Sequence, residues 1–200
     1  YYDVHSPGPD VLNLVIADVS GHGPVASVAM AMMRTATQSW CRGAHAPSTV
    51  VPEINELMHT SLEEGMFITA CFLSMDRRTS RLDYVNCGHN PPIVRRRAGG
   101  IEFLDDGGGP PLGICPTLDP PPGFCSLQSG DALVLYTDGI PEAFSPRGDL
   151  LGMPRLVEAV ERGGNDPERI KQSVLWTLDQ HQAGRPRVDD QTLVGVGFRA

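Results

Sequence analysis

Residues 11–30 read VLNLVIADVSGHGPVASVAM, and this stretch does most to decide the fold. Positions 11–18 are rich in Val, Leu and Ile and end on a carboxylate, which predicts a buried strand. The glycines of SGHG suit the turn that follows. From Pro24 to about Trp40 small and sulfur-containing residues recur every three or four positions, and Pro24 suits the first turn of a helix. The stretch therefore predicts a strand that leads through a glycine turn into a closely packed helix.

The residues after this helix predict a second helix and then a change of period. Ser48 follows a break at 42–47 and suits an N-cap. Apolar residues then continue at helical spacing, at Ile54, Leu57, Met58 and Leu62. Four short runs rich in β-branched and aromatic residues come next, at 67–76, 80–88, 91–97 and 99–104. Turn residues separate them, so they predict an antiparallel meander.

The second half of the chain begins with a loop rich in Gly and Pro. Residues 105–123 show no periodicity and predict a segment on the surface of the sheet. Strands resume at 124–128 and 132–138, two or three helices fill 139–181, and 191–198 predicts a last strand. This order of elements indicates an α+β sandwich in a single domain.

The composition excludes several classes of function. The chain has 200 residues, of which 40% are hydrophobic, and 16 Lys and Arg against 24 Asp and Glu give a net charge of −8. Such a surface does not attract nucleic acid or an anionic membrane. Lys171 is the single lysine and follows Ile170, so the sequence has no P-loop and little basis for Schiff-base chemistry.

Cysteine usage and hydropathy indicate where the protein works. The five cysteines form no CxxC pair, and an odd number fits reduced thiols and a cytoplasmic protein. No run approaches 18 apolar residues and no basic leader precedes an apolar run, so we expect neither a membrane span nor a secretion signal. The sequence begins with Tyr1 rather than Met, and we expect it to be a segment of a longer protein.

The glycine turn matches the dinucleotide-binding pattern G-x-G-x-x-[GA] in GHGPVA, at a strand-to-helix junction. A dinucleotide site needs a second parallel strand after the helix and an acidic residue about 20 positions on. Here a second helix follows, and no Asp or Glu occurs between Asp18 and Glu53. Ser20 is no hydrolase nucleophile elbow either, because Asp18 stands where that motif requires glycine. A simple glycine turn, with Asp18 capping the next helix, remains an alternative.

Carboxylates stand at one end of three predicted strands. Asp18 ends one apolar strand, Asp138 ends another, and the pair Asp189 and Asp190 comes just before the last strand. If these side chains meet at one edge of a sheet they repel one another and require a cation. All-oxygen ligation indicates Mg²⁺ or Mn²⁺, and the absence of His-x-x-x-His and of Cys pairs argues against zinc.

Four motifs in order resemble one family. DVSGHG (18–23), YVNCGHNPP (84–92), GDALVLYTDGIPEA (130–143) and DDQTLV (189–194) together resemble the PPM-type protein serine/threonine phosphatases. The nearest branch is the bacterial one of stage II sporulation protein E and the sigma-B regulator phosphatases. The resemblance implies one PPM-type domain over residues 1–200, built as an αββα sandwich of two antiparallel β-sheets flanked by helices.

The resemblance also implies a site with two ions, Mn²⁺ or Mg²⁺. Asp18 would bridge both ions, and the backbone carbonyl of Val19 would complete one coordination sphere. Asp138 and Asp189 would bind the second ion, with Asp190 as a weaker candidate. Asp18, Asp138 and Asp189 are therefore the expected catalytic residues, because they hold the ions that activate a bridging water.

The start of the chain departs from the family pattern. The family carries an early aspartate in a stretch similar to GGDYYD, of which this sequence keeps only YYD. The first strand and the GGD stretch would then precede Tyr1, and Asp3 matches the trailing aspartate. His22 and His89 are open, since each could act in acid or base catalysis or serve only as a turn residue.

By resemblance, the substrate would be a phosphorylated protein such as an anti-sigma-factor antagonist. A sensor or receiver domain would precede this segment, which we expect to contact no nucleic acid and no membrane; a homodimer is left open. The missing early aspartate motivates an alternative, a weak or inactive module of the same fold that binds a regulatory partner. Hydrolysis of small phosphate esters is a third reading.

Overall fold

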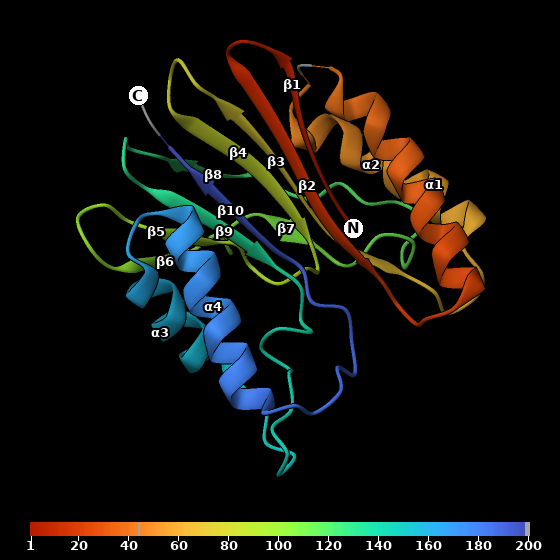
Figure 1. The fold of residues 1–200 in the computed structure, drawn as a ribbon. Coiled ribbons are helices and arrows are strands. Elements are labelled where there is room, and N and C mark those ends of the chain that lie inside the picture. Colours follow the sequence, from red (N-terminus) through yellow and green to blue (C-terminus); the bar gives the residue numbers. More distant parts are fainter. Residues whose placement is uncertain (44, 199–200) are drawn as a thin grey trace. The chain divides into compact units, whose positions relative to one another are not determined.

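The computed structural model describes residues 1–43 and 45–198, and over these residues it contains ten strands and four helices. The chain divides into two compact units (Figure 1). The first unit comprises residues 1–91 and 104–126, and the second comprises residues 92–103 and the chain from 127 onward.

The first unit is a six-stranded sheet with two helices on one face. The strand order is β1-β2-β3-β4-β7, and β8 also pairs with β4; all pairs are antiparallel except β4 with β7. The strands are β1 (Tyr2–Gly8), β2 (Val11–Val19), β3 (Ile68–Asp76), β4 (Arg81–Cys87), β7 (Gly108–Gly109) and β8 (Gly123–Ser126). The helices are α1 (Pro24–Cys41) and α2 (Pro47–Ser61).

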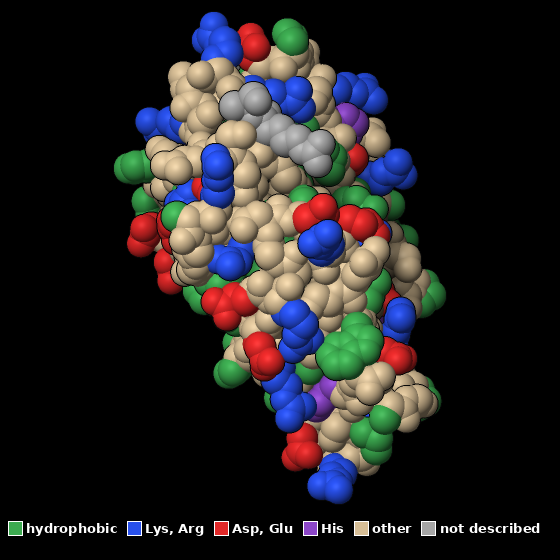
Figure 2. All heavy atoms as spheres, turned by 60° about the vertical axis from the view of Figure 1, so that its left-hand side comes forward, with side chains coloured by type: hydrophobic (Ala, Val, Ile, Leu, Met, Phe, Trp, Pro, Cys, Tyr) green, Lys and Arg blue, Asp and Glu red, His purple; other side chains and the backbone are tan. Residues whose placement is uncertain are grey.

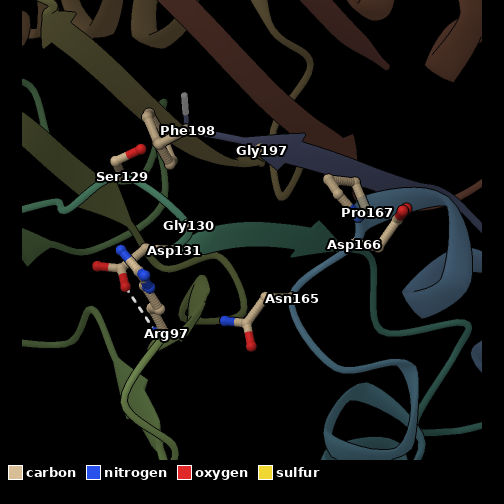
Figure 3. A pocket seen from close by; sticks show the side chains of 9 residues that line it. All are labelled: Arg97, Ser129, Gly130, Asp131, Asn165, Asp166, Pro167, Gly197 and Phe198. Carbon is tan, nitrogen blue, oxygen red and sulfur yellow. Dashed lines mark hydrogen bonds between the residues drawn. The ribbon is translucent and has the colours of Figure 1, made fainter. Parts of the chain in front are cut away.

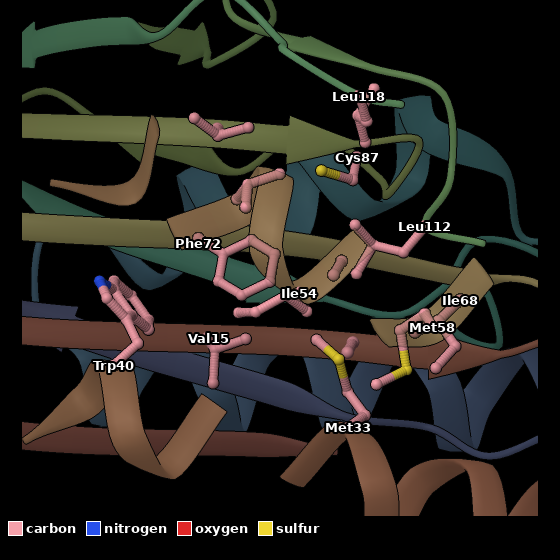
Figure 4. Packing of buried hydrophobic residues seen from close by; sticks show 14 of the residues in the cluster. Val15, Met33, Trp40, Ile54, Met58, Ile68, Phe72, Cys87, Leu112 and Leu118 are labelled. Atoms are coloured by element: carbon pink, nitrogen blue, oxygen red, sulfur yellow. The ribbon is translucent and has the colours of Figure 1, made fainter. Parts of the chain in front are cut away.

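Alternation along β2 decides which side chains meet the helices. Val15, Ala17 and Val19 point to the helix side and join the core, so Asp18 points to the opposite face of the sheet. Figure 4 shows this core, in which Trp40 of α1 meets Phe72 of β3 edge to face with ring centroids 5.5 Å apart. This packing holds the C-terminal end of β2 in place.

The second unit is a four-stranded antiparallel sheet with two helices. The strand order is β10-β9-β5-β6. The strands are β5 (Ile93–Arg95), β6 (Ile101–Phe103), β9 (Ala132–Tyr136) and β10 (Leu193–Gly197), and the helices are α3 (Gly152–Gly163) and α4 (Pro167–Gln182). The side chain of Asp166 caps α4 by accepting hydrogen bonds from the backbone of Glu168 and Arg169. Every residue of β9 is buried, and the strand carries the chain directly to Asp138.

The structure confirms the α+β class, with two sheets and four helices over the described residues. It corrects several details of the predicted elements. Helix α2 begins at Pro47 with Ala46 as N-cap, so Ser48 is not the cap. The runs at 91–97 and 99–104 do not continue the meander, because in the second unit β5 pairs with β9 and β6 pairs with β5.

The Gly/Pro-rich segment is also not a surface loop throughout. It contains β7, and Leu112 is fully buried and pairs with Ile68 at the start of β3. The sequence pattern did not predict β1, an edge strand whose residues alternate between half-buried and exposed. In the six-stranded sheet, only β4 and β7 pair in parallel, through two residue pairs.

On the face shown in Figure 2, Lys and Arg side chains are interspersed with Asp and Glu rather than gathered into one basic patch. Over residues 1–43 and 45–198, none of the helices combines the length and apolar character that a membrane crossing requires.

A buried carboxylate secures the turn into β9. Asp131, 2% exposed, accepts hydrogen bonds from the backbone of Arg97 at 2.7 Å and Gln128 at 3.0 Å, and from the Arg96 guanidinium at 2.8 Å. Burial alone raises the pKa of Asp131, but these bonds outweigh it, so the pKa is held below its ordinary value.

We expect Asp131→Ala to lower the free energy of unfolding by about 3 kcal/mol at pH 7, because it leaves buried N–H groups without an acceptor. The folded-state pKa lies below the unfolded value of about 3.9, so the stabilisation is complete above about pH 4 and disappears as the pH falls through the folded-state pKa. Urea unfolding of the wild type and the variant between pH 3 and 7 measures this. Asp119→Ala, at an exposed carboxylate, serves as control; an equal loss at both positions would contradict the prediction.

Candidate metal centre

Asp18 and Val19 lie at the end of β2 in the first unit. Asp18 pairs with Thr69 of β3, and Val19 pairs with Ile68. Beyond the strand, Ser20 continues the pairing, since its N–H donates to the Phe67 carbonyl and its hydroxyl accepts from the Phe67 N–H, at 3.0 and 2.9 Å. The backbone that carries the Asp18 carboxylate and the Val19 carbonyl is thus fixed on both sides of these groups.

The GHG turn leads from this strand end into α1. Gly21 and Gly23 both have φ +88°, in the left-handed region that favours glycine, and His22 between them is exposed. Gly23 is the N-cap of α1, and no side chain caps this helix. The alternative in which Asp18 is only a helix cap is therefore wrong.

Asp3 lies apart from Asp18, although both belong to the first unit. Asp3 pairs with Val15, so its side chain points to the helix side of the sheet, opposite to Asp18. Burial raises its pKa, but the outcome is a lowered pKa, because a hydrogen bond from His5 and one from the Val4 N–H outweigh that effect. Its place in the fold does not make it a substitute for the early ligand.

In the second unit the structure brings the Asp138 segment and the Asp189–Asp190 segment together. The Thr137 hydroxyl donates to the Asp190 carbonyl at 3.1 Å and accepts from the Thr192 N–H at 3.0 Å. Gln191 donates from its side chain to the Gly139 carbonyl at 3.0 Å. Both neighbours of Asp138, Thr137 and Gly139, are therefore hydrogen-bonded to the segment 190–192, about fifty positions later in the sequence.

The donor set of this unit fits a hard cation. The Asp138 Oδ1 atom is buried and has no hydrogen-bond partner among the described residues, which is costly for a carboxylate oxygen unless a cation or proton meets it. Asp189 and Asp190 are both exposed, and Asp189 Oδ1 accepts from the Asp190 N–H at 2.8 Å. Gly139 permits the close crossing, because a Cβ there would lie 2.3 Å from the Asp190 carbonyl oxygen.

The predicted ligands come from two different units of the chain. Among the described residues, no three or more His, Cys, Asp or Glu side chains are grouped so that they could hold a metal ion. The predicted ligands are divided, with Asp18 and Val19 in the first unit and Asp138, Asp189 and Asp190 in the second. Oxygen donors alone make up this set, which suits Mg²⁺ or Mn²⁺.

Two polar residues in contact with His89 were not singled out from the sequence. Thr69 lies opposite Asp18, and Asn86 bonds to the backbone of His89. His89 is 7% exposed, and its Nδ1 lies 2.9 Å from the Thr69 hydroxyl. The motif YVNCGHNPP pointed to His89 as an acid–base or turn residue, but only the register between β2 and β3 identifies Thr69.

A pocket of about 530 Å³ lies elsewhere in the second unit (Figure 3). It is at the start of β9, the opposite end of that strand from Asp138, and it contains none of the predicted ligands. Arg97, Asp131 and Asp166 line it, so its charges are mixed. Asp166 already accepts hydrogen bonds at the N-terminus of α4, and we assign no ligand to this pocket.

Comparison with known proteins finds relatives over nearly the whole chain. The profile of the family described as Stage II sporulation protein E (SpoIIE) matches residues 8–199. The phosphoserine phosphatase RsbU of Bacillus subtilis is 28% identical over 150 residues, which cover 75% of this chain and 44% of RsbU. The chain thus spans less than half the length of that relative.

Solved structures share the fold. The RsbU and RsbW domains of Rv1364c from Mycobacterium tuberculosis match with a TM-score of 0.81 and 25% identity, covering 100% of this chain and 55% of that one. RsbX in complex with magnesium matches with a TM-score of 0.73 and 17% identity, covering 98% of this chain and 84% of that one. These likenesses confirm the fold that the motifs led us to expect.

Proposed function

The chain belongs to the stage II sporulation protein E family, and from this membership we propose that it is a metal-dependent protein serine/threonine phosphatase. The observation that carries the proposal is the buried Asp138 Oδ1, which has no hydrogen-bond partner among residues 1–43 and 45–198 and lies where the Asp189–Asp190 segment crosses its own. A carboxylate oxygen in that state is suited to a divalent cation. The family supplies the reaction, since RsbU is a phosphoserine phosphatase.

The ligands we propose are the five that the sequence indicated. Asp18 and the Val19 carbonyl would hold one ion, with Asp18 shared, and Asp138 and Asp189 would hold the other. Asp190 would be the weaker candidate for the second ion, and the Thr137 hydroxyl holds its backbone carbonyl in place. When bound, two Mn²⁺ or Mg²⁺ ions supply Lewis-acid activation of a water and neutralise charge on the phosphoryl oxygens. RsbX, which shares the fold, was solved with magnesium.

The chain's own residues orient the segments that carry the proposed ligands. The bonds of Ser20 with Phe67 hold the strand end that presents Asp18, and those of Thr137 hold the two segments of the second unit. The reaction needs no nucleophile from the protein, so the protein contributes mainly by positioning the groups for in-line attack at phosphorus.

For the substrate we propose a phosphoserine or phosphothreonine on a signalling protein of the kind that antagonises an anti-sigma factor. A sensor or receiver domain in the rest of the protein would control the activity. We place the protein in the cytoplasm, which suits five cysteines that are all free thiols, four of them buried. The homodimer stays a prediction.

Hydrolysis of p-nitrophenyl phosphate tests the proposal. We expect turnover with added Mn²⁺ and its loss with EDTA, followed by release of phosphate from a phosphoserine peptide. The second candidate is an inactive module of the same fold that binds a regulatory partner. A chain extended upstream of Tyr1 decides between them: no turnover at any Mn²⁺ concentration in either form would reject the enzyme and support the module.

A further inference from the structure

His89 and Thr69 lie next to a proposed metal ligand without being ligands themselves. Asp18 and Thr69 are direct register partners across β2 and β3, so their side chains project from the same face of the sheet. The start of β3 is also fixed on its other side, because Ile68 exchanges two backbone hydrogen bonds with Leu112 at 3.0 and 2.8 Å. Thr69 therefore occupies a rigid position beside the last residues of β2.

The Thr69 hydroxyl connects two groups. Its oxygen lies 3.4 Å from the Asp18 carbonyl oxygen, to which it donates, and 2.9 Å from Nδ1 of His89. A hydroxyl has one hydrogen to donate and two lone pairs with which to accept. We assign His89 the tautomer with its hydrogen on Nδ1, in which the ring donates to the Thr69 oxygen and leaves the hydroxyl hydrogen for the Asp18 carbonyl. The ring thereby orients the hydroxyl toward the backbone of β2.

The backbone of His89 is itself held tightly. Its N–H donates to Asn86 Oδ1 at 2.7 Å, and the Asn86 side chain donates to its carbonyl at 2.9 Å. The preceding Gly88 has φ +69°, and a Cβ at that position would lie 2.6 Å from the ring of Pro111. With two backbone bonds, a glycine turn and burial, the imidazole has little freedom to leave Thr69.

We propose that His89 is a positioning residue, which acts through the Thr69 hydroxyl to fix the Asp18 backbone carbonyl. Through that carbonyl it holds the end of β2, which presents the Asp18 carboxylate and the Val19 carbonyl. The inference rests on the proposed function, because it assigns these residues to the metal centre. Removal of a group that orients a metal ligand through a hydrogen bond is expected to weaken metal binding about 10-fold to 100-fold.

The test compares variants that keep or remove each hydrogen bond. Thr69→Val removes the hydroxyl and keeps the shape, whereas Thr69→Ser keeps the hydroxyl. His89→Leu removes the donor, whereas His89→Asn keeps a donor close to the position of Nδ1. Mn²⁺ affinity is measured by isothermal titration calorimetry on the whole chain, with melting temperatures in EDTA and the Mn²⁺ dependence of p-nitrophenyl phosphate hydrolysis.

We expect Thr69→Val and His89→Leu each to weaken Mn²⁺ binding about 10-fold or more, and the Ser and Asn variants to stay within about 3-fold of the wild type. The double variant should be no worse than either single one, since both changes break one chain of hydrogen bonds. His59→Ala, at an exposed histidine of α2, should leave affinity unchanged.

Unchanged Mn²⁺ affinity in Thr69→Val, or additive losses in the double variant, would overturn the positioning role. A fall of the melting temperature in EDTA with unchanged affinity would also overturn it, by showing a purely structural part. If the wild type itself neither binds Mn²⁺ nor hydrolyses the ester, the proposed function fails and this inference fails with it.

Discussion

Asp18→Asn should abolish phosphatase turnover and leave the fold of the first unit intact. A carboxylate shared by two ions contributes to both sites, and its replacement by an amide removes negative charge where two dications must be held together. We expect kcat/KM for p-nitrophenyl phosphate to fall at least 100-fold at saturating Mn²⁺, which corresponds to about 3 kcal/mol of barrier. The Asp18 side chain points away from the helix-covered core, so the melting temperature in EDTA should change little.

Asp10→Asn is the matched control for charge. Asp10 is an exposed carboxylate near the start of the same strand, and its replacement changes the net charge by the same amount. This variant should keep wild-type activity. If Asp18→Asn retains more than about a tenth of the wild-type rate, a loss below about 1.4 kcal/mol, Asp18 does not bridge two ions.

The sequence was most informative where one pattern fixed one element. The apolar run that ends on Asp18, the two glycines of the turn and the Pro at the start of α1 all have the structure that local chemistry indicates. The buried run before Asp138 forms β9 for the same reason. In these segments, strand, turn and helix preferences agree with the tertiary fold.

The predictions from sequence were wrong where pairing between distant segments decides the sheet to which a strand belongs or whether a residue is buried. The runs of β5 and β6 have the composition of strands, but no local feature indicates that β5 pairs with β9 instead of β4. Leu112 is buried because it meets Ile68, across more than forty residues of chain. Such pairings depend on tertiary context, which a single sequence does not reveal.

The same distinction applies to the candidate centre. The aspartates were recognisable because Asp18 and Asp138 stand at strand ends before glycine-containing turns and all of them match family motifs, although their roles as ligands stay predictions. Thr69 was not recognisable, because an ordinary threonine in a strand gains its place only through the register that sets it opposite Asp18. Gly139 likewise resembled any turn glycine until the crossing of its segment with Asp190 was known.

Gly139→Ala should disrupt the centre from the second unit. An added Cβ would lie 2.3 Å from the Asp190 carbonyl oxygen and 3.5 Å from the Asp189 Cβ. The first contact is with backbone, which the Thr137 hydroxyl also binds, so no flexible side-chain end can give way. The two segments must separate, and the proposed ligands Asp138 and Asp189 move apart with them.

We expect Gly139→Ala to raise the Mn²⁺ concentration for half-maximal activity about 10-fold and to lower kcat/KM at least 100-fold, since small misplacement of catalytic groups has effects of this size. Gly8→Ala is the control, because its added Cβ meets nothing within 4 Å and its φ is not in the left-handed region. Circular dichroism and melting in EDTA distinguish local displacement from unfolding. A folded Gly139→Ala variant with wild-type Mn²⁺ dependence and rate would mean that the crossing of these two segments does not set the geometry of the metal site.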